Sequence, residues 1–124
     1  MQIIISNSID TPIYEQIASS IKESILKGDL VGGEALPSIR SLARDLRISN
    51  ITTKRAYEEL EHDGFITSVP GKGYFVKKKS EEFLKEEIYT KIEEKLNEVI
   101  ILANTYNIEY SELKEMLDTL FKEE

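Results

Sequence analysis

The residues best suited to chemistry lie between Leu46 and Phe65, in the stretch LRISNITTKRAYEELEHDGF. Within ten residues this stretch carries three cationic side chains, three serine or threonine hydroxyls and one asparagine. Cationic groups bind phosphates, and small hydroxyl and amide side chains hydrogen-bond to base edges. The composition therefore indicates contact with a nucleic acid, although the formal net charge of the chain is −7.

The negative charge is unevenly distributed along the chain. Residues 1–79 contain 11 Lys or Arg and 10 Asp or Glu, whereas residues 80–124 contain 5 and 13. Between Leu36 and Lys79 there are 9 cations and 5 anions. Because binding depends on the local field, an acidic total does not argue against a DNA-binding surface in the first part.

The length of 124 residues suits about one domain. There is no cysteine, which excludes disulfides and thiol nucleophiles and is compatible with a reducing cytoplasm. No apolar run reaches the roughly 18 residues of a membrane span, and no secretory signal opens the chain. We therefore expect a cytoplasmic protein without a membrane partner.

The first predicted helix follows residues 1–10, which form an N-terminal arm or a short strand. It begins at Thr11-Pro12, a capping hydroxyl with proline at the first helical position. Gly28 ends it. Isoleucines at every fourth position form one buried stripe: Ile13, Ile17, Ile21 and Ile25.

A second helix is predicted to start at Ser38, with arginines along one side and apolar residues along the other. A row of arginines is often only a solvated face, so by itself it does not identify a binding surface. The arginines are Arg40, Arg44 and Arg47, and the apolar residues are Ile39, Leu42, Ala43 and Leu46.

A third helix is predicted to begin after Ser49 as its cap. At 100° per residue, Thr53, Ala56, Tyr57 and Leu60 fall on one side, which we interpret as the core face. The opposite side carries Ile51, Lys54, Arg55 and Glu58, with Thr52 at its margin. An exposed isoleucine is unusual on a solvated face, but it could cover a thymine methyl group.

After Gly64, the segments FITSV and YFVKK are predicted to pair as a β-hairpin around PGKG, with Lys72 at its tip. Such a hairpin alone is commonly structural. The order of helix, helix, turn, helix and hairpin predicts a winged helix-turn-helix. The expected fold class is mainly α with a small β-hairpin, followed by a two-helix C-terminal dimerisation region.

The stretch from Thr11 to Val76 resembles the DNA-binding domain of GntR-family transcriptional regulators. The resemblance rests on LPSIRSLA, RAYEELEHDGFI and GKGYFV, in that order. The opening PIYEQI and the short tail resemble the YtrA-type subfamily. Two positions depart from the pattern: Arg47 replaces a frequent glycine in the turn, and Ile51 replaces a common asparagine. The second departure leaves the operator sequence open.

The resemblance implies that Arg40 contacts DNA and that Ser49, Asn50, Thr52 and Lys54 contact bases or phosphates. It also implies that the wing tip enters the minor groove. The outward surface adds three more residues. The predicted DNA-binding set is Arg40, Arg44, Ser49, Asn50, Ile51, Thr52, Lys54, Arg55, Gly71, Lys72 and Gly73.

The acidic tail is predicted to form two helices, one from Ser80 to about Ala103 and one capped by Ser111. The domain division is thus 1–10, 11–79 and 80–124. Either the tail folds back on its own winged helix, or it forms a homodimer, as the resemblance implies. The predicted dimerisation residues are Leu84, Ile88, Ile92, Leu96, Val99, Ile100, Ala103, Leu113, Leu117 and Leu120.

These features predict a repressor that binds double-stranded DNA at an inverted repeat, without a cofactor or a metal. An unknown small-molecule effector, if the protein has one, is expected at the dimer interface or between the tail and the wing. An enzyme is disfavoured because the only histidine, His62, stands at a helix end and shares no face with Glu61 or Asp63. The remaining alternative is a winged-helix protein-interaction module.

Overall fold

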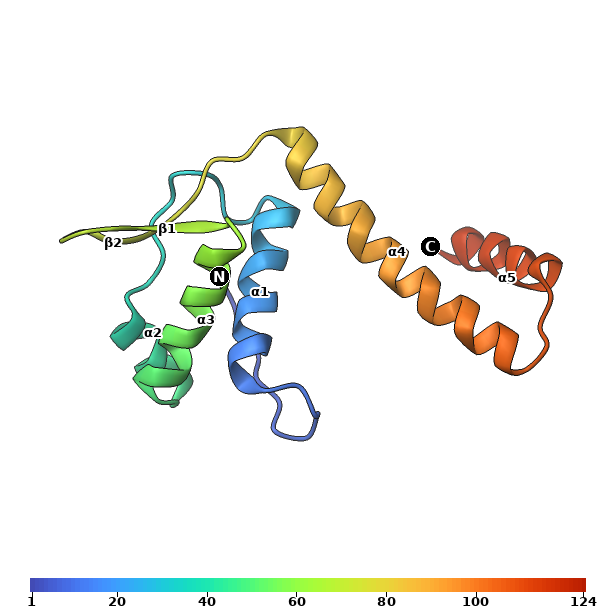
Figure 1. Ribbon diagram of the computed structural model, residues 1–124, viewed down its shortest axis with the longest axis horizontal. Helices are drawn as coiled ribbons and strands as arrows, with labels where there is room; N and C mark the ends of the chain where they lie inside the picture. Colours follow the sequence, from blue (N-terminus) through green and yellow to red (C-terminus); the bar gives the residue numbers. More distant parts are fainter. The chain divides into compact units, whose positions relative to one another are not determined.

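The computed structural model describes residues 1–124 and contains five helices and one two-stranded sheet (Figure 1). The chain forms two compact units, Met1–Leu84 and Lys85–Glu124. The division falls inside a helix, five residues beyond the boundary expected at Lys79. The predicted fold class, a winged helix-turn-helix followed by two helices, is confirmed. The dimerisation role assigned to the tail stays a prediction.

Helix α1, Ile13–Lys27, buries three of the four predicted isoleucines, Ile17, Ile21 and Ile25, whereas Ile13 is only partly buried. Its N-cap is Pro12, so the capping role predicted for Thr11 is wrong. The Thr11 carbonyl instead accepts a hydrogen bond from the Gln16 side chain at 2.8 Å. The Gln16 side chain also accepts from the Ser6 N–H and donates to the Ser6 carbonyl. These hydrogen bonds connect the N-terminal arm to the first turn of α1.

Helices α2, Ile39–Leu46, and α3, Asn50–His62, begin at the predicted caps. The Ser38 hydroxyl accepts from the Ser41 N–H at 3.1 Å, and the Ser49 hydroxyl accepts from the Thr52 N–H at 3.0 Å. Such caps satisfy amide donors that have no partner within the helix. The four residues assigned to the core face of α3 are all buried: Thr53, Ala56, Tyr57 and Leu60.

Strands β1, Ile66–Val69, and β2, Gly73–Val76, pair antiparallel with Ile66 opposite Val76 and Val69 opposite Gly73. They are shorter than the segments predicted for them. The connection between α1 and α2 adds to this sheet, since the Leu36 N–H donates to the Tyr74 carbonyl at 2.9 Å. The wing is therefore anchored to the helical core through its second strand.

The second unit consists of helix α4, Glu81–Thr105, from Lys85 onward, and helix α5, Tyr110–Glu123. The Ser80 hydroxyl caps α4 through the Phe83 N–H, as predicted. The predicted Ser111 cap of α5 is wrong, because Ser111 lies within the helix. Glu109 precedes the helix, and its N–H donates to the Glu112 carboxylate at 3.2 Å. No helix is both long and apolar enough to cross a membrane.

Candidate nucleic-acid interface

The start of α3 presents small polar groups at the protein surface. The Ser49 hydroxyl donates to the Thr52 hydroxyl at 2.8 Å while it caps the helix. The Thr52 hydroxyl therefore keeps its own proton free for an external acceptor. Asn50, next to the cap, is also exposed. These groups stand where the helix dipole is positive, which favours contact with phosphate oxygens.

Ile51 is the most exposed large apolar residue of the chain, with 81% of its surface accessible. It lies between the polar groups at the start of α3 and Lys54, which is also exposed. No carboxylate lies within 4.0 Å of the Lys54 ammonium, so its charge is not neutralised locally. The predicted outward face is therefore confirmed in its position, although its contacts with DNA stay a prediction.

Helix α2 exposes Arg40 and Arg44 beside α3, against which it packs. Arg47 ends the helix in the left-handed conformation, with φ 58° and ψ 47°. The Ile48 N–H then donates to the Ala43 carbonyl, which closes the turn between the two helices. The turn thus needs the conformation that glycine adopts easily, although this chain supplies an arginine.

The angle between α2 and α3 is fixed by a buried tyrosine. The Tyr57 hydroxyl donates to the Pro37 carbonyl at 2.7 Å, directly before the cap of α2. The ring of Tyr57 also meets that of Tyr74 edge-on, with 5.0 Å between centroids. Burial raises the pKa of Tyr57 above its ordinary value, so the hydroxyl keeps the proton that it donates.

The wing projects from the same unit and carries Lys72 at its tip. Gly71 and Gly73 have φ of 76° and 108°, which side chains other than glycine rarely adopt. The Lys72 N–H donates to the Val69 carbonyl at 2.9 Å and closes the turn. Toward the turn end of β1, the Glu61 carboxylate accepts from both the N–H and the hydroxyl of Ser68, which ties β1 to α3.

Arg55 differs from the other predicted cations because it contacts helix α1. Its guanidinium lies 3.9 Å from the centroid of the Tyr14 ring and donates to the Tyr14 hydroxyl at 3.2 Å. That hydroxyl in turn donates to the Glu15 carboxylate at 3.1 Å, which raises the pKa of Tyr14. Arg55 is therefore held at the junction of α1 and α3, whereas Lys54 is free to reach outward.

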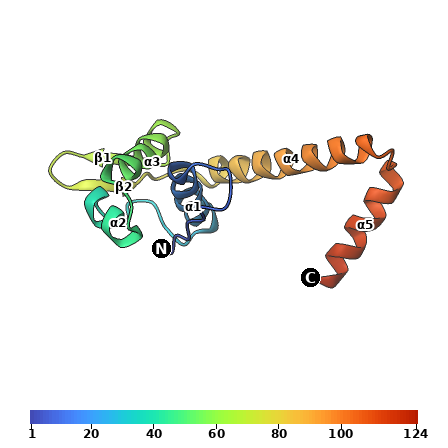
Figure 2. The same ribbon diagram turned by 90° about the horizontal axis from the view of Figure 1, so that it is seen from below.

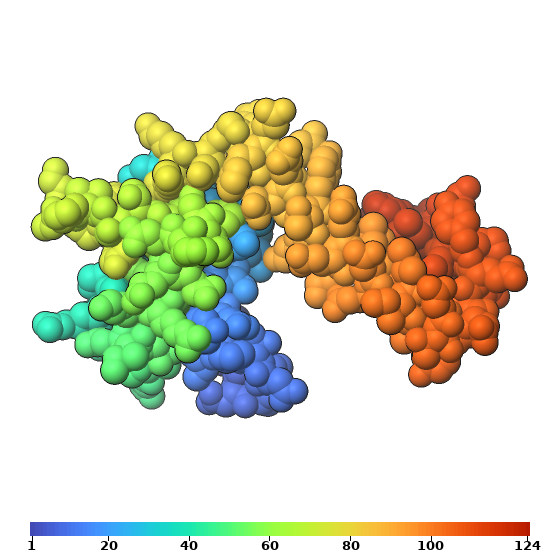
Figure 3. Space-filling model, viewed as in Figure 1, coloured from blue at the N-terminus to red at the C-terminus, as the bar shows by residue number.

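The two orthogonal ribbon views place α2 and the wing tip on one side of the first unit, away from α1 (Figures 1 and 2). In the space-filling view, the same two elements form the outer edge of the unit, and α3 lies between α2 and α1 (Figures 1 and 3). The elements that carry Arg40, Arg44, Lys54 and Lys72 thus adjoin one surface, whereas Arg55 is turned toward α1. The breadth and mixed chemistry of this surface suit a duplex with accessible phosphates and base edges.

The second unit exposes an apolar surface along α4 and α5. Ile92, Leu96 and Val99 are 43–50% exposed, and Leu117 and Leu120 on α5 are 48% and 59% exposed. Leu113 is half-buried. Two members of the predicted dimerisation set are not part of this exposed surface, since Leu84 packs on the core of the first unit and Ala103 is already buried.

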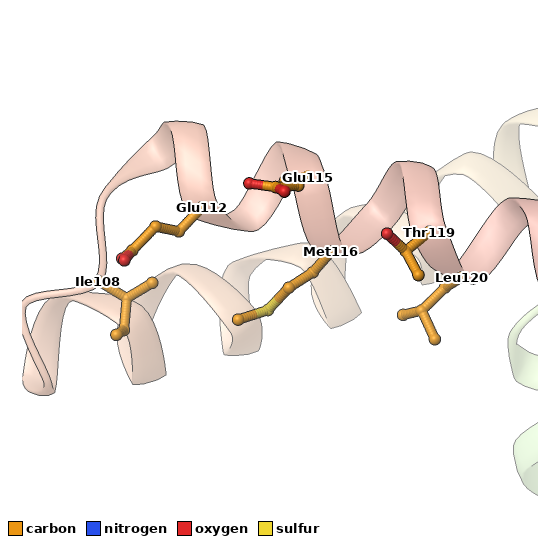
Figure 4. A pocket seen from close by; sticks show the side chains of 6 residues that line it. All are labelled: Ile108, Glu112, Glu115, Met116, Thr119 and Leu120. Carbon is orange, nitrogen blue, oxygen red and sulfur yellow. The ribbon is translucent and has the colours of Figure 1, made fainter.

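A groove separates α4 from α5 near the turn that joins them. It is lined by side chains of both helices, among them Val99, Leu102 and Leu113, and has a volume of about 420 Å³. A neighbouring depression runs along α5 and is lined by Ile108, in the turn before the helix, and by Met116 and Leu120 of the helix (Figure 4). The two helices do not fill the space between them, so apolar side chains remain accessible.

The described residues do not support a catalytic or metal-binding site. The His62 side chain is 90% exposed and lies 3.4 Å from the Asp63 carboxylate, its neighbour in sequence. No three side chains of His, Asp or Glu come together as a metal site requires. The hydroxyl of Tyr57, the buried tyrosine of α3, already donates its hydrogen bond to the Pro37 carbonyl.

Sequence reasoning did not identify Tyr14, Tyr57 or Glu61 as residues that hold the interface in place. Tyr14 and Arg55 are 41 residues apart, and Tyr57 and Pro37 are 20 apart, so no local pattern relates them. The only available signal was a tyrosine on the core face of α3. A buried tyrosine usually needs a hydrogen-bond partner, which predicts an acceptor nearby without saying where.

Comparison with known proteins gives one consistent result. Residues 13–76 match the family model described as "Bacterial regulatory proteins, gntR family". A curated relative, the HTH-type transcriptional repressor YtrA of Bacillus subtilis, is 38% identical over 107 residues, which cover 86% of this chain and 82% of the relative. The resemblance predicted from the motifs is therefore confirmed.

Solved structures agree with this result. A GntR family transcriptional regulator from Listeria monocytogenes superposes with a TM-score of 0.75 at 28% identity, covering 93% of this chain and 98% of that chain. The DNA-binding domain of AraR in complex with operator ORE1 superposes with a TM-score of 0.52 at 26% identity, covering 61% of this chain and 93% of that one. The first match extends over both units, and the second covers part of the chain.

Proposed function

Because the chain belongs to the gntR family of bacterial regulatory proteins and is a DNA-binding transcriptional regulator, we propose that it represses transcription by binding an inverted-repeat operator as a homodimer. The observation that carries the proposal is the surface formed by α2, the start of α3 and the wing tip. It combines exposed cations with small polar groups and one exposed isoleucine. We further propose that the protein acts in the cytoplasm and has no enzymatic activity.

The start of α3 would enter the major groove, since its small side chains allow a close approach to base edges. Asn50 and Thr52 would then contact bases, and Ile51 would cover a thymine methyl group. Arg40 and Lys54 would contact phosphates on either side. The structure of the AraR DNA-binding domain in complex with an operator supports operator binding through this domain.

The homodimer is supported by the apolar surface of α4 and α5. Side chains such as Ile92 and Leu96 are about half exposed in the single chain, and an apolar surface of this extent usually marks an interface. A twofold dimer would hold two recognition helices at a fixed spacing, which explains an inverted repeat. Six of the predicted residues besides these two remain candidates for the interface: Ile88, Val99, Ile100, Leu113, Leu117 and Leu120.

The acidic charge of the second unit fits the same arrangement. Residues 85–124 carry 11 acidic and 5 basic residues, whereas the cations of the interface lie between residues 40 and 72. Carboxylates repel phosphate, so the tail would not hold DNA by non-specific attraction. The protein would then bind DNA through the winged helix alone.

The decisive experiment is selection of bound sequences from a random duplex pool at physiological salt. Enrichment of an inverted repeat with half-sites about one helical turn apart, or a multiple of it, would support the proposal. If folded protein enriched no sequence, operator binding would have to depend on a further ligand, or the winged helix would serve protein contacts. If single half-sites were enriched, the homodimer would be contradicted.

The dimer is tested separately by sedimentation of Leu96→Glu, which places a charge in the apolar stripe of α4. We expect a monomer that binds half-sites weakly. Thr90→Glu is the matched control, because it adds the same charge on the opposite side of the same helix. A Leu96→Glu dimer as stable as the parent would show that this stripe is not the interface.

A further inference from the structure

A cavity of about 350 Å³ lies in the first unit, apart from the predicted DNA-binding surface. It is formed by the end of α1, the connection that follows, the segment after β2 and the first turn of α4. This volume falls at the lower end of the range for small-molecule sites, roughly 300–1,000 Å³. The lining residues are Ile25, Gly28, Leu30, Val31, Gly32, Val76, Lys77, Lys78, Lys79 and Leu84.

The inner wall of the cavity is apolar and belongs to the core. Ile25, Leu30 and Val76 are 5%, 7% and 2% exposed, so their positions are fixed by packing. Leu84 closes the wall from α4 and contacts the same core cluster. These side chains offer no hydrogen bond to a ligand, and they would therefore receive a hydrocarbon group.

The walls are held by backbone hydrogen bonds, so the cavity does not depend on flexible side chains alone. The Gly33 N–H donates to the Val76 carbonyl at 2.7 Å, and the Lys77 N–H donates to the Phe65 carbonyl at 2.9 Å. At Gly32 a Cβ atom would lie 2.9 Å from the Lys78 Cα, so only glycine permits this close approach. Nothing lies within 4 Å of the position that a Cβ would occupy at Gly28, which leaves that side open.

Three consecutive lysines, Lys77, Lys78 and Lys79, surround the mouth of the cavity. None has a carboxylate within 4.0 Å of its ammonium group. The Lys79 ammonium lies 4.7 Å from the centroid of the Phe83 ring, which is not part of the lining, so Lys77 and Lys78 are the lysines best placed for a ligand. The carboxylate of Glu34, a neighbour of the cavity, accepts from the Val31 N–H at 3.0 Å and is not part of the lining.

These lysines stand at the other end of the hairpin from the wing tip. Lys77 follows the end of β2, where its N–H is bonded to Phe65 at the base of the hairpin, whereas Lys72 stands at the tip. At about 3.3 Å per strand residue, the two ends of the hairpin are roughly 15 Å apart. The lysines of the cavity thus lie apart from the wing tip and beside the apolar wall, where an anion that carries a hydrocarbon group can reach both.

We propose that this cavity binds an amphipathic carboxylate, with a short hydrocarbon chain against the apolar wall and the anion at the lysines. The proposal goes beyond operator binding, because the lining of this site contains none of the predicted DNA-binding residues. An apolar wall alone would accept neutral hydrocarbons, and lysines alone would accept any anion. The two together select a molecule that carries both groups.

The test is isothermal titration calorimetry of the full chain with octanoate, without DNA, so that the result does not depend on operator binding. We expect saturable binding of one octanoate per chain. Each buried methylene should change affinity about fourfold, so hexanoate should bind up to roughly fifteenfold more weakly. Octanol and acetate, which lack one of the two groups, should show no saturable binding.

Two variants locate the site. Val31→Trp places a large side chain at the mouth, where the valine is 59% exposed, and should abolish octanoate binding without affecting the core. Lys77→Gln should weaken binding about two- to fivefold, as expected for one partly exposed ion pair. Lys72→Gln removes the same charge at the wing tip and should leave octanoate binding unchanged.

The proposal is overturned if the parent shows no saturable heat with octanoate. It is also overturned if Val31→Trp binds octanoate as the parent does, because the ligand would then occupy another apolar surface, such as that of α4 and α5. Equal affinities for octanoate and hexanoate would contradict the assigned apolar wall. Equal affinities for octanoate and octanol would contradict the role of the lysines.

Discussion

Replacement of Tyr57 by phenylalanine tests whether the position of α2 depends on one buried hydrogen bond. Tyr57 is fully buried, and its hydroxyl donates to the Pro37 carbonyl at 2.7 Å. Phenylalanine keeps the ring and its edge-on contact with Tyr74, but it leaves the carbonyl without this donor. The free energy of unfolding should fall by about 1–3 kcal/mol at pH 8. For a unit of this size each kcal/mol corresponds to roughly 4–8 °C in Tm.

The same variant should change the response to alkaline pH. Burial raises the pKa of Tyr57 above the ordinary value near 10, so the folded state holds the phenolic proton more tightly than the unfolded state does. The resulting stability is complete below pH 10 and is lost as the pH rises toward the folded-state pKa. By pH 11 the parent should lose about 1.4 kcal/mol more than the variant.

The assay is urea denaturation at one protein concentration, at pH 8 and in steps to pH 11. The control is Tyr106→Phe, since Tyr106 is 68% exposed and should leave stability unchanged at every pH. The reasoning would be refuted by a Tyr57→Phe variant as stable as the parent at pH 8. It would also fail if the difference between parent and variant stayed constant up to pH 11.

Three further predictions concern the helices that carry the interface. Arg47→Gly should raise the free energy of unfolding by about 1 kcal/mol, because φ is 58° there, whereas Arg47→Ala should give no such gain in thermal denaturation. Ser49→Ala should lower stability by about 1 kcal/mol through loss of the cap, while Ser49→Asp should keep the cap and weaken DNA binding through its charge. Arg40→Ala and Lys54→Ala should each weaken binding to all duplexes and reduce the slope of log K against log salt by roughly one, measured between 50 and 200 mM salt. Unchanged slopes would show that these side chains do not meet phosphate.

The elements of the winged helix were predictable because their signals are local. Ser38 and Ser49 supply caps, and both form the expected hydrogen bonds. The core face of α3 followed from helical periodicity, and all four of its residues are buried. The two failed caps, at Thr11 and Ser111, have a common reason. A hydroxyl near a helix start is a weak signal when a proline or a carboxylate one or two residues away can take the same position.

The contacts that fix these elements relative to one another were not predictable. In the sequence, Glu61 resembles an ordinary solvated carboxylate, yet it accepts hydrogen bonds from both the N–H and the hydroxyl of Ser68. Arg55 looks like Lys54, yet it stacks on Tyr14. In each case the partner is distant in sequence, so the assignment requires the fold. Helical periodicity could divide α3 into inward and outward faces, but it could not separate outward cations that reach solvent from those held by a neighbouring helix.

The distribution of these contacts suggests how operator preference can vary on one scaffold. The residues that join α2, α3 and the wing point inward or toward each other, as Tyr57 and Glu61 do. Ile51 and Lys54 point outward, and Ile51 is 81% exposed, so its replacement removes little buried surface. Changes at exposed sites away from caps usually alter stability by no more than about 0.5 kcal/mol. Substitution of Ile51 by asparagine, which the resemblance identifies as common at this position, should therefore change the selected sequence while the folded winged helix remains as stable as before.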